Sequence, residues 1–292
     1  MKVGVKLVGD GISAFSGKFD EIMEKKNSVL CIGLDPALPE QRVVHVIPPR
    51  YLQNVPEDEA RLNFCLDILR ETSDYCLAAK PNEQYVRGFS ARQHRTLTDF
   101  IRKQGLLSIY DCKLGDIRDT AESAIFHIKK WGYDAITVNP FPGNLEELVK
   151  IAHGTQPFLG IIVLTLMSNP EAERMMKNAT IGTEPVFVEI AKDVEKYSAD
   201  GCVVGATGHV TSRDLKLIRD EVGQDKILLI PGVGAQSGDP TKVIENGGRR
   251  ILINVGRDII YSDNPKKKAM EYCSAFNELR RAREKDDNQI IS

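Results

Sequence analysis

Residues 106–116 read LLSIYDCKLGD, an apolar run that ends in two carboxylates separated by a lysine. The apolar part predicts a buried strand, and successive side chains of a strand point to opposite faces. Asp111 and Lys113 therefore point to the same side, and Asp116 lies just beyond them in the next loop. So dense a group of charges adds little stability, because like charges taken out of water repel each other. Either the lysine delivers a proton beside an anionic substrate, or this is a surface ion pair at a strand end.

Similar apolar runs recur along the chain, and near-continuous apolar strands are typical of a sheet buried on both faces. Amphipathic helices are expected between them, as in the i, i+3, i+4, i+7 series Leu62, Cys65, Leu66 and Leu69. The predicted strands are Val29–Leu34, Tyr75–Lys80, Leu107–Asp111, Ala135–Asn139, Leu159–Leu164, Gly201–Ala206, Ile227–Ile230 and Ile251–Val255. Eight such βα units predict an α/β protein with a single (β/α)₈ TIM barrel domain over residues 1–292, and a doubly wound sheet is the second choice.

Four segments interrupt or flank this repeat. Residues 36–58 are rich in proline and follow the first strand, and residues 168–183 follow the fifth. In a barrel both would lie at the carboxyl ends of the strands, where long loops can act as lids. Residues 1–27 are an N-terminal extension, and the polar tail 284–292 is expected to fray. We also expect helix N-caps at Asn144 and Ser212 and a helix-ending glycine at Gly132.

The composition excludes several classes of protein. The chain has 292 residues, 42% of them hydrophobic and 27% charged, with a net charge of −2, so nothing favours binding to nucleic acid. No apolar stretch is long enough to span a membrane, and the N-terminus does not resemble a signal peptide. Six scattered cysteines and five dispersed histidines predict reduced thiols, no metal site and a cytoplasmic location.

Polar residues stand at the carboxyl end of several predicted strands. Gly33-Leu34-Asp35 follows the first strand, Lys80-Pro81-Asn82 the second, and Met167-Ser168 the fifth. A barrel brings these ends to one face, where buried ions are costly unless each has an opposite neighbour. An alternation of Lys80, Asp111, Lys113 and Asp116 would satisfy that condition.

Two glycine-rich turns follow the last two strands. Residues 231–239 read PGVGAQSGD and residues 254–258 read NVGRD. Glycines let backbone N–H groups approach an anion, and the loops after barrel strands seven and eight are the recurrent phosphate site of this fold. The guanidinium of Arg257 suits phosphate oxygens, so these turns predict a phosphate site, although a tight turn is the simpler interpretation of the glycines alone.

Taken together, these motifs resemble the orotidine 5′-phosphate decarboxylase family, in the family's order from about residue 29 to 261. The matching segments are GLD at 33–35, KPN at 80–82, D-x-K-x-x-D-I at 111–117 with Thr120, MS at 167–168, PGVGAQ at 231–236 and VGR at 255–257. The KPN form is similar to a subgroup distinct from the yeast-type enzymes. That subgroup usually has Arg-Gly where Leu114-Gly115 stands, and residues 1–27 and 36–58 match no family segment.

The resemblance implies decarboxylation of orotidine 5′-monophosphate to UMP and CO₂, the last step of de novo UMP biosynthesis, without metal or organic cofactor. It implies that Lys113 donates a proton to C6, Asp111 faces the departing carboxylate, and Lys80 and Asp116 complete the charge network. The implied substrate contacts are Asp35 and Lys80 with Asn82 near the ribose, Ser168 at the pyrimidine, and Gln236, Gly256 and Arg257 around the phosphate. Pro231 is a further implied substrate-binding residue.

The resemblance also implies a homodimer in which Asp116, Ile117 and Thr120 reach the partner's site, and it makes orotate phosphoribosyltransferase a candidate partner. Two other functions stay open at this point. Metal-dependent sugar-phosphate lyases of the same superfamily share D-x-K-x-x-D, but they resemble each other in a glutamate at the second strand end, where Lys80 would repel Mg²⁺. A non-catalytic phosphate-binding barrel would have no use for the four intact charges.

Overall fold

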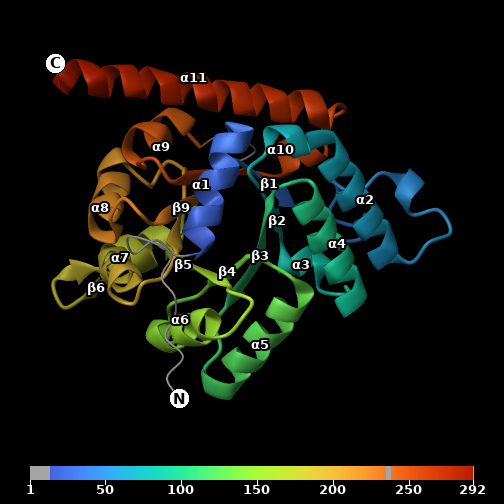
Figure 1. Cartoon of the computed structure of the whole chain (residues 1–292), viewed down its shortest axis with the longest axis horizontal. Coiled ribbons are helices and arrows are strands. Elements are labelled where there is room, and N and C mark those ends of the chain that lie inside the picture. Colours follow the sequence, from blue (N-terminus) through green and yellow to red (C-terminus); the bar gives the residue numbers. More distant parts are fainter. Residues whose placement is uncertain (1–13, 235–237, 292) are drawn as a thin grey trace.

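The strands of this computed structural model close into one parallel barrel (Figure 1). The structure describes residues 14–234 and 238–291, with side chains as far as residue 285. The barrel strands are β1 (Leu30–Leu34), β2 (Ala78–Pro81), β3 (Leu107–Leu114), β4 (Ala135–Val138), β5 (Gly160–Leu166), β8 (Gly201–Val204), β9 (Ile227–Pro231) and β10 (Ile251–Val255). Because β1 pairs with both β2 and β10, the sheet has no edge among these strands. The predicted barrel is confirmed, and the doubly wound sheet is wrong.

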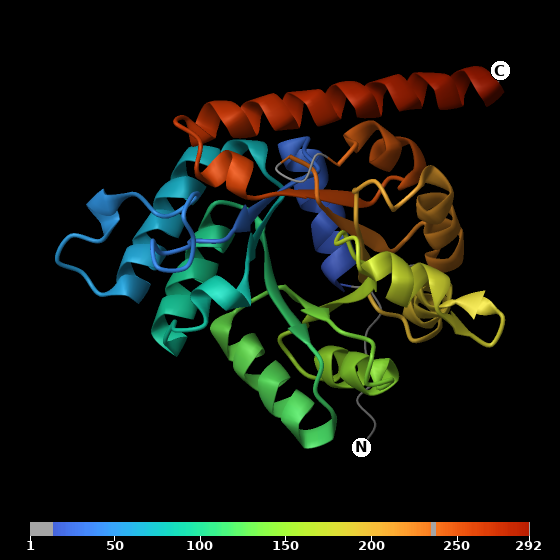
Figure 2. The same cartoon turned by 180° about the vertical axis from the view of Figure 1, so that it is seen from behind.

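Helices surround the barrel, as both views show (Figures 1 and 2). The longer ones are α2 (Glu57–Thr72), α4 (Ala91–Lys103), α5 (Arg118–Trp131), α6 (Leu145–Gly154), α7 (Val186–Lys196), α8 (Ser212–Val222), α9 (Pro240–Asn246) and α11 (Pro265–Ile291). Short helices α3 (Glu83–Val86) and α10 (Arg257–Ile260) directly follow β2 and β10. Every residue of β1, β2, β4, β5 and β8 is buried, as strands covered on both faces require.

Local signals account for most element ends, with some corrections. Gly132 ends α5 in the left-handed conformation and Asn144 precedes α6, both as predicted. The N-cap of α8 is Thr211 rather than the predicted Ser212, because the Thr211 hydroxyl accepts from the Asp214 N–H in a capping box. The predicted strand over Tyr75–Lys80 begins only at Ala78, since Ser73–Tyr75 forms the 3₁₀ turn η2.

The N-terminal extension contributes to the barrel. Helix α1 (Ala14–Lys26) lies across the amino ends of the strands, where Phe15 packs so close to Gly160 that a Cβ there would stand 2.8 Å from its ring. Lys18 pairs with Asp134 at the start of β4 (2.5 Å), and Asp20 pairs with Arg250 at the start of β10 (2.6 Å). The end of the barrel opposite the predicted site is therefore closed by this helix.

The C-terminal tail differs from the prediction. Instead of fraying from residue 284, α11 continues as a helix to Ile291. Residues 284–291 contain neither glycine nor proline, so the helix meets no strong sequence signal to stop. Figure 2 shows α11 running along one side of the molecule, past the ring of helices.

The two long loops differ in how much secondary structure they contain. Residues 36–58 contain the 3₁₀ turn η1 (Pro49–Tyr51), and Ile47 from this loop is fully buried. Residues 168–183 contain the π-helical turn η3 (Glu173–Asn178) and strand β6 (Thr180–Ile181), which pairs with β7 (Glu184–Pro185) in a small hairpin. The second loop is thus more structured than a simple polar connection.

Candidate active site

One carboxylate lies between two ammonium groups at the carboxyl end of the barrel. Asp111 Oδ2 is 2.5 Å from Lys80 Nζ, and Asp111 Oδ1 is 2.8 Å from Lys113 Nζ. Thr137 on β4 also donates its hydroxyl to Asp111 Oδ1 at 2.9 Å. Asp111 and Lys80 are only 8% and 6% exposed, so each buried charge has the opposite neighbour that its desolvation demands.

The backbone at the end of β3 is irregular where it presents Lys113. The pairing register with β4 shifts between Tyr110 and Leu114, as in a β-bulge. Lys113 adopts a φ of +50°, which side-chain-bearing residues rarely do, and its N–H donates to Thr137 Oγ1 at 2.9 Å. Such strain persists only where surrounding contacts enforce it, and it is common at functional sites. The predicted proximity of Asp111 and Lys113 is confirmed, but it is reached through a bulge rather than a regular strand.

Electrostatics keep both partners of the buried pair charged. Burial alone would raise the pKa of Asp111, but the positive charges of Lys80 and then Lys113 hold it well below its ordinary value. Burial would likewise lower the pKa of Lys80, yet Asp111 and then Asp35 raise it above the usual lysine value. The Lys113 side chain is 39% exposed, so its ammonium is the one open to a ligand.

A cavity of about 160 Å³ opens beside these charges. Its polar wall consists of Lys80, Asp111, Lys113, Thr137 and Ser168, and its apolar wall of Leu164, Met167, Val203, Leu229 and Pro231. Six strands (β2, β3, β4, β5, β8 and β9) and the loop after β5 therefore contribute to it. A charged cluster against an apolar wall is an environment in which electrostatic interactions are strong, because little water screens them.

The end of β1 approaches the same face. Asp35 has a buried Oδ1 that accepts no hydrogen bond from the described residues. Its main-chain carbonyl accepts from the Tyr261 hydroxyl at 2.7 Å, and that hydroxyl accepts from Ala37 N–H at 2.8 Å, so the backbone here is held. Asn82 instead caps α3, since its Oδ1 accepts from the Gln84 N–H at 3.1 Å. The carboxylate of Asp35 is thus available to a ligand, whereas the Asn82 carbonyl oxygen is engaged.

The predicted phosphate loops lie after β9 and β10. Gly256 packs so near β1 that a Cβ there would lie 3.3 Å from the Gly33 carbonyl oxygen. Arg257 begins α10, and its guanidinium makes no hydrogen bond or ion pair with the described residues. Gln236 lies outside the described residues, so its predicted role rests on the sequence alone.

Three predicted residues are not brought into the cluster of their own chain. Asp116, Ile117 and Thr120 are all exposed in or after the β3–α5 loop. The Asp116 carboxylate accepts only the neighbouring Ile117 N–H among the described groups, at 2.9 Å. The predicted alternation of four charges is therefore found within this chain for Lys80, Asp111 and Lys113 but not for Asp116, because the chain turns outward after Leu114.

Sequence reasoning missed two polar residues on barrel strands. Thr137 bonds both Asp111 and the Lys113 backbone, and Asn254 on β10 has a buried Oδ1 without a partner among the described residues. A hydroxyl or an amide inside an apolar strand is the signal that could have found them, since such a strand otherwise has no use for a polar side chain.

The part of the chain that the structure describes holds no group of three histidine, cysteine or acidic side chains that could bind a metal ion. All six cysteines are free, as predicted. Among the described helices, none is both long and apolar enough to cross a membrane.

Comparison with known proteins identifies the family of this chain. Residues 28–272 match the model of the orotidine 5′-phosphate decarboxylase / HUMPS family. The chain belongs to this family. An orotidine 5′-phosphate decarboxylase from Porphyromonas gingivalis is 33% identical over 84% of the chain and 87% of its own length. One from Bordetella petrii is 33% identical over 88% and 93%.

Solved structures of this family are similar as well. The OMP decarboxylase of Leishmania donovani superimposes with a TM-score of 0.73 at 25% identity, over 92% of this chain and 99% of that one. The part of this chain that matches the family model begins at residue 28, so helix α1 lies before the matched residues.

Proposed function

We propose that this protein is an orotidine 5′-phosphate decarboxylase that converts orotidine 5′-monophosphate to UMP and CO₂ in pyrimidine biosynthesis, with Lys113 as the proton donor. Family membership and the names of the relatives support the reaction. The single observation that carries the mechanism is the Asp111 carboxylate held between the Lys80 and Lys113 ammonium groups beside a cavity.

The chemistry needs charges that are in place before the reaction starts. When the bond between C6 and the carboxylate breaks, CO₂ leaves and its electron pair stays on C6. The ammonium of Lys113 stabilises that charge and then transfers a proton to C6, after which solvent restores the proton on the lysine. Asp111, whose low pKa keeps it ionised, faces the substrate carboxylate and disfavours the ground state relative to the transition state.

Substrate contacts follow from the placement of the other strand ends. The unpartnered Asp35 carboxylate and the Lys80 ammonium hold ribose hydroxyls with Asn82 nearby, and Ser168 contacts the pyrimidine. Gly256 and Arg257 bind the phosphate together with Gln236, and Pro231 lies against the substrate in the apolar wall of the cavity. The free guanidinium of Arg257 supports this assignment, since a phosphate supplies the acceptor that the described residues do not.

The active unit is a homodimer in this proposal. Asp116 and Thr120 complete the partner's site, which would explain why they turn away from their own cluster. Ile117 (50% exposed) and Phe141 (88% exposed) stand on neighbouring loops, because the Asn144 side chain donates to the Asp116 carbonyl at 3.0 Å. Large exposed apolar side chains on adjoining loops are typical of an interface. The enzyme would be cytoplasmic, and orotate phosphoribosyltransferase is the partner to test.

A metal-dependent lyase is less consistent with this site. The residue at the end of β2 is a buried lysine with a raised pKa, and its positive charge opposes a divalent cation beside Asp111. Turnover should therefore be unaffected by EDTA.

The test follows the fall in absorbance when the protein meets orotidine 5′-monophosphate with EDTA present. Wild type should turn over, and Lys113→Ala should not, although it should still bind UMP, because the ammonium acts mainly as charge develops. Lys150→Ala removes an exposed lysine on α6 and serves as the control that should keep full activity. Absence of wild-type turnover would refute the reaction, and turnover by Lys113→Ala near the wild-type rate would remove Lys113 from the mechanism.

A further inference from the structure

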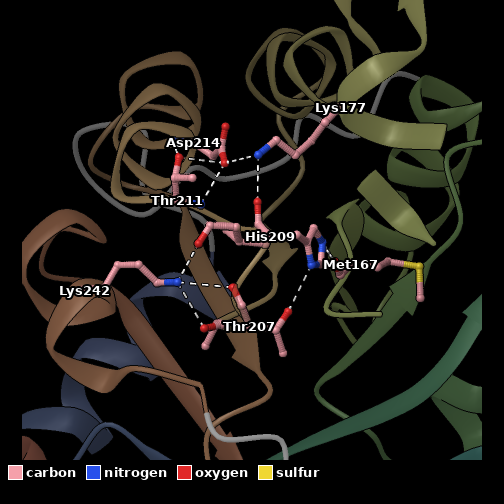
Figure 3. A network of polar contacts seen from close by, with 9 residues as sticks. Met167, Lys177, Thr207, His209, Thr211, Asp214 and Lys242 are labelled. Carbon is pink, nitrogen blue, oxygen red and sulfur yellow. Dashed lines mark hydrogen bonds and ion pairs between the residues drawn. The ribbon is translucent and has the colours of Figure 1, made fainter. Parts of the chain in front are cut away.

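The loop between β8 and α8, residues 205–211, holds the end of β5 through three consecutive carbonyl groups. Gly205 N–H donates to Leu166 O at 2.7 Å, His209 Nε2 donates to Met167 O at 2.9 Å, and Thr207 Oγ1 donates to Ser168 O at 2.6 Å. Figure 3 shows the His209 ring between Thr207 and Met167. Only the first bond joins two main-chain groups, and the other two are made by side chains.

The approach of the two segments is unusually close. A Cβ on Gly205 would stand 2.6 Å from the Ser168 Cα, so only glycine fits at this position. The backbone at Ser168 is therefore in contact with the β8–α8 loop as well as bonded to it, and a shift in one segment displaces the other.

The β8–α8 loop is itself anchored from two sides, as Figure 3 also shows. Lys242 on α9 donates to the carbonyls of Ala206, Thr207 and Val210, at 3.2, 3.2 and 2.5 Å. Lys177 of η3 donates to His209 O and to the Asp214 carboxylate, both at 2.7 Å. Burial alone would raise the pKa of Asp214, but hydrogen bonds from Lys177 and Thr211 lower it, so the ion pair persists at neutral pH.

The side chain of Ser168 has no such support of its own. It lines the cavity beside Lys113, and its hydroxyl makes no hydrogen bond with the described residues. Its direction is therefore set by the backbone on either side, which the β8–α8 loop holds. Lys242 links that loop to α9, the helix that follows the predicted phosphate turn of residues 231–239.

We infer that Thr207 and His209 are positioning residues that orient the Met167–Ser168 segment toward the pyrimidine of the substrate. The inference rests on the proposed function and adds to it a specificity element outside the substrate contacts. A displacement of about 1 Å in a group that contacts substrate can cost about a hundredfold in rate, so small shifts of this segment matter. Neither residue lines the cavity, and both act through Ser168.

The hydrogen-bonding roles determine which substitutions are informative. The Thr207 hydroxyl uses its only hydrogen for Ser168 O, so Thr207→Val removes that bond at nearly constant volume and Thr207→Ser keeps it. His209 donates from Nε2, so His209→Gln retains a donor and His209→Leu does not. Thr96→Val is the matched control, because its hydroxyl donates to the Arg92 carbonyl on the exposed side of α4 and contacts neither the β8–α8 loop nor Ser168.

The experiment measures kcat/KM for orotidine 5′-monophosphate, and competitive inhibition by UMP and by ribose 5-phosphate, which lacks the pyrimidine. Thr207→Val should lower kcat/KM about tenfold to a hundredfold and weaken UMP inhibition, while inhibition by ribose 5-phosphate stays the same. Thr207→Ser and Thr96→Val should stay near wild type. Equal weakening of both inhibitors, or no change in either, would overturn the inference, since a merely structural role affects both ligands alike.

A double-variant cycle tests the route through Ser168. If Thr207 acts through that residue, Thr207→Val should have little further effect in a Ser168→Ala background, and additive losses would contradict the inference. If Thr207→Val fails to fold, the pair His209→Gln and His209→Leu provides the same comparison, with loss expected only for leucine. An inactive wild type would refute the proposed function, whereas an active wild type with unaffected variants would refute only this inference.

Discussion

Removing the Asp111 carboxylate, which lies at the centre of the charge cluster, should destabilise the protein much more than removing an exposed member of an ion pair. In Asp111→Asn the shape is retained, but the buried Lys80 ammonium loses the carboxylate with which it forms its ion pair, and Thr137 faces a neutral amide. Breaking a buried pair in this way costs about 3 to 5 kcal/mol. Because the asparagine oxygen can still accept a hydrogen bond, we expect the lower end, about 3 kcal/mol.

Two comparison variants test whether the loss of stability depends on the burial of the ion pair. Lys113→Met breaks a direct contact of 2.8 Å to Asp111, but the Lys113 side chain is 39% exposed, so water replaces much of the interaction and the loss should stay below about 1 kcal/mol. Asp99→Asn breaks the exposed Arg102–Asp99 pair on α4 and should change stability by less than about 0.5 kcal/mol. The expected order therefore follows burial rather than distance.

Urea unfolding, followed by circular dichroism, measures these differences in the free energy of unfolding. The slope of that free energy against urea concentration should be the same for all variants. The difference in unfolding free energy between wild type and Asp111→Asn should become smaller as the pH falls below about 4, the ordinary aspartate pKa. The pKa of Asp111 is lower in the folded protein than in the unfolded chain. The stabilisation that its charge provides is therefore fully present above the unfolded-state pKa, and it is lost as the pH falls toward the folded-state pKa. If Asp111→Asn unfolds at the wild-type urea concentration, the buried Lys80 does not depend on Asp111, and our account of the cluster is wrong.

Other outcomes can be measured on the same protein. Arg257→Ala should lose more than about 2 kcal/mol of transition-state stabilisation for orotidine 5′-monophosphate, from kcat/KM, and much less for a substrate lacking phosphate; equal losses would mean a structural role. Mixing inactive Lys113→Ala and Asp116→Ala subunits should restore about half of wild-type activity per heterodimer, and subunit exchange confirmed by mass without recovery would refute a shared site. Burial lowers the pKa of His94 to about 4, so stability should fall by roughly 3 kcal/mol between pH 6.5 and 4, because protonation favours the unfolded chain. His94→Phe should flatten that slope, and an unchanged slope would assign it to other groups.

Much of the fold follows from the sequence because a barrel strand must be apolar on both faces. All eight predicted runs became barrel strands, and the last, Ile251–Val255, has the predicted bounds. Strand ends were harder to predict, as β3 shows. It continues past Asp111 to Leu114, because backbone pairing with β4 extends over polar residues that the hydrophobic pattern does not mark.

The sequence by itself also placed Lys80, Asp111, Lys113 and Ser168 on one face, because parallel strands of a barrel bring all their carboxyl ends together. It could not identify their neighbours across strands. Thr137 meets Asp111 only through the register of β4 against a bulged β3, and register depends on how the whole barrel closes.

Tertiary structure alone decided three further features. Asp116 turns away from the cluster, α1 closes the opposite end of the barrel, and residues 205–209 hold the carbonyls beside Ser168. Each depends on contacts between segments far apart in the chain. Hydrophobic periodicity reports which side of an element is buried, but the partner on that side is selected by packing and hydrogen-bond geometry in three dimensions.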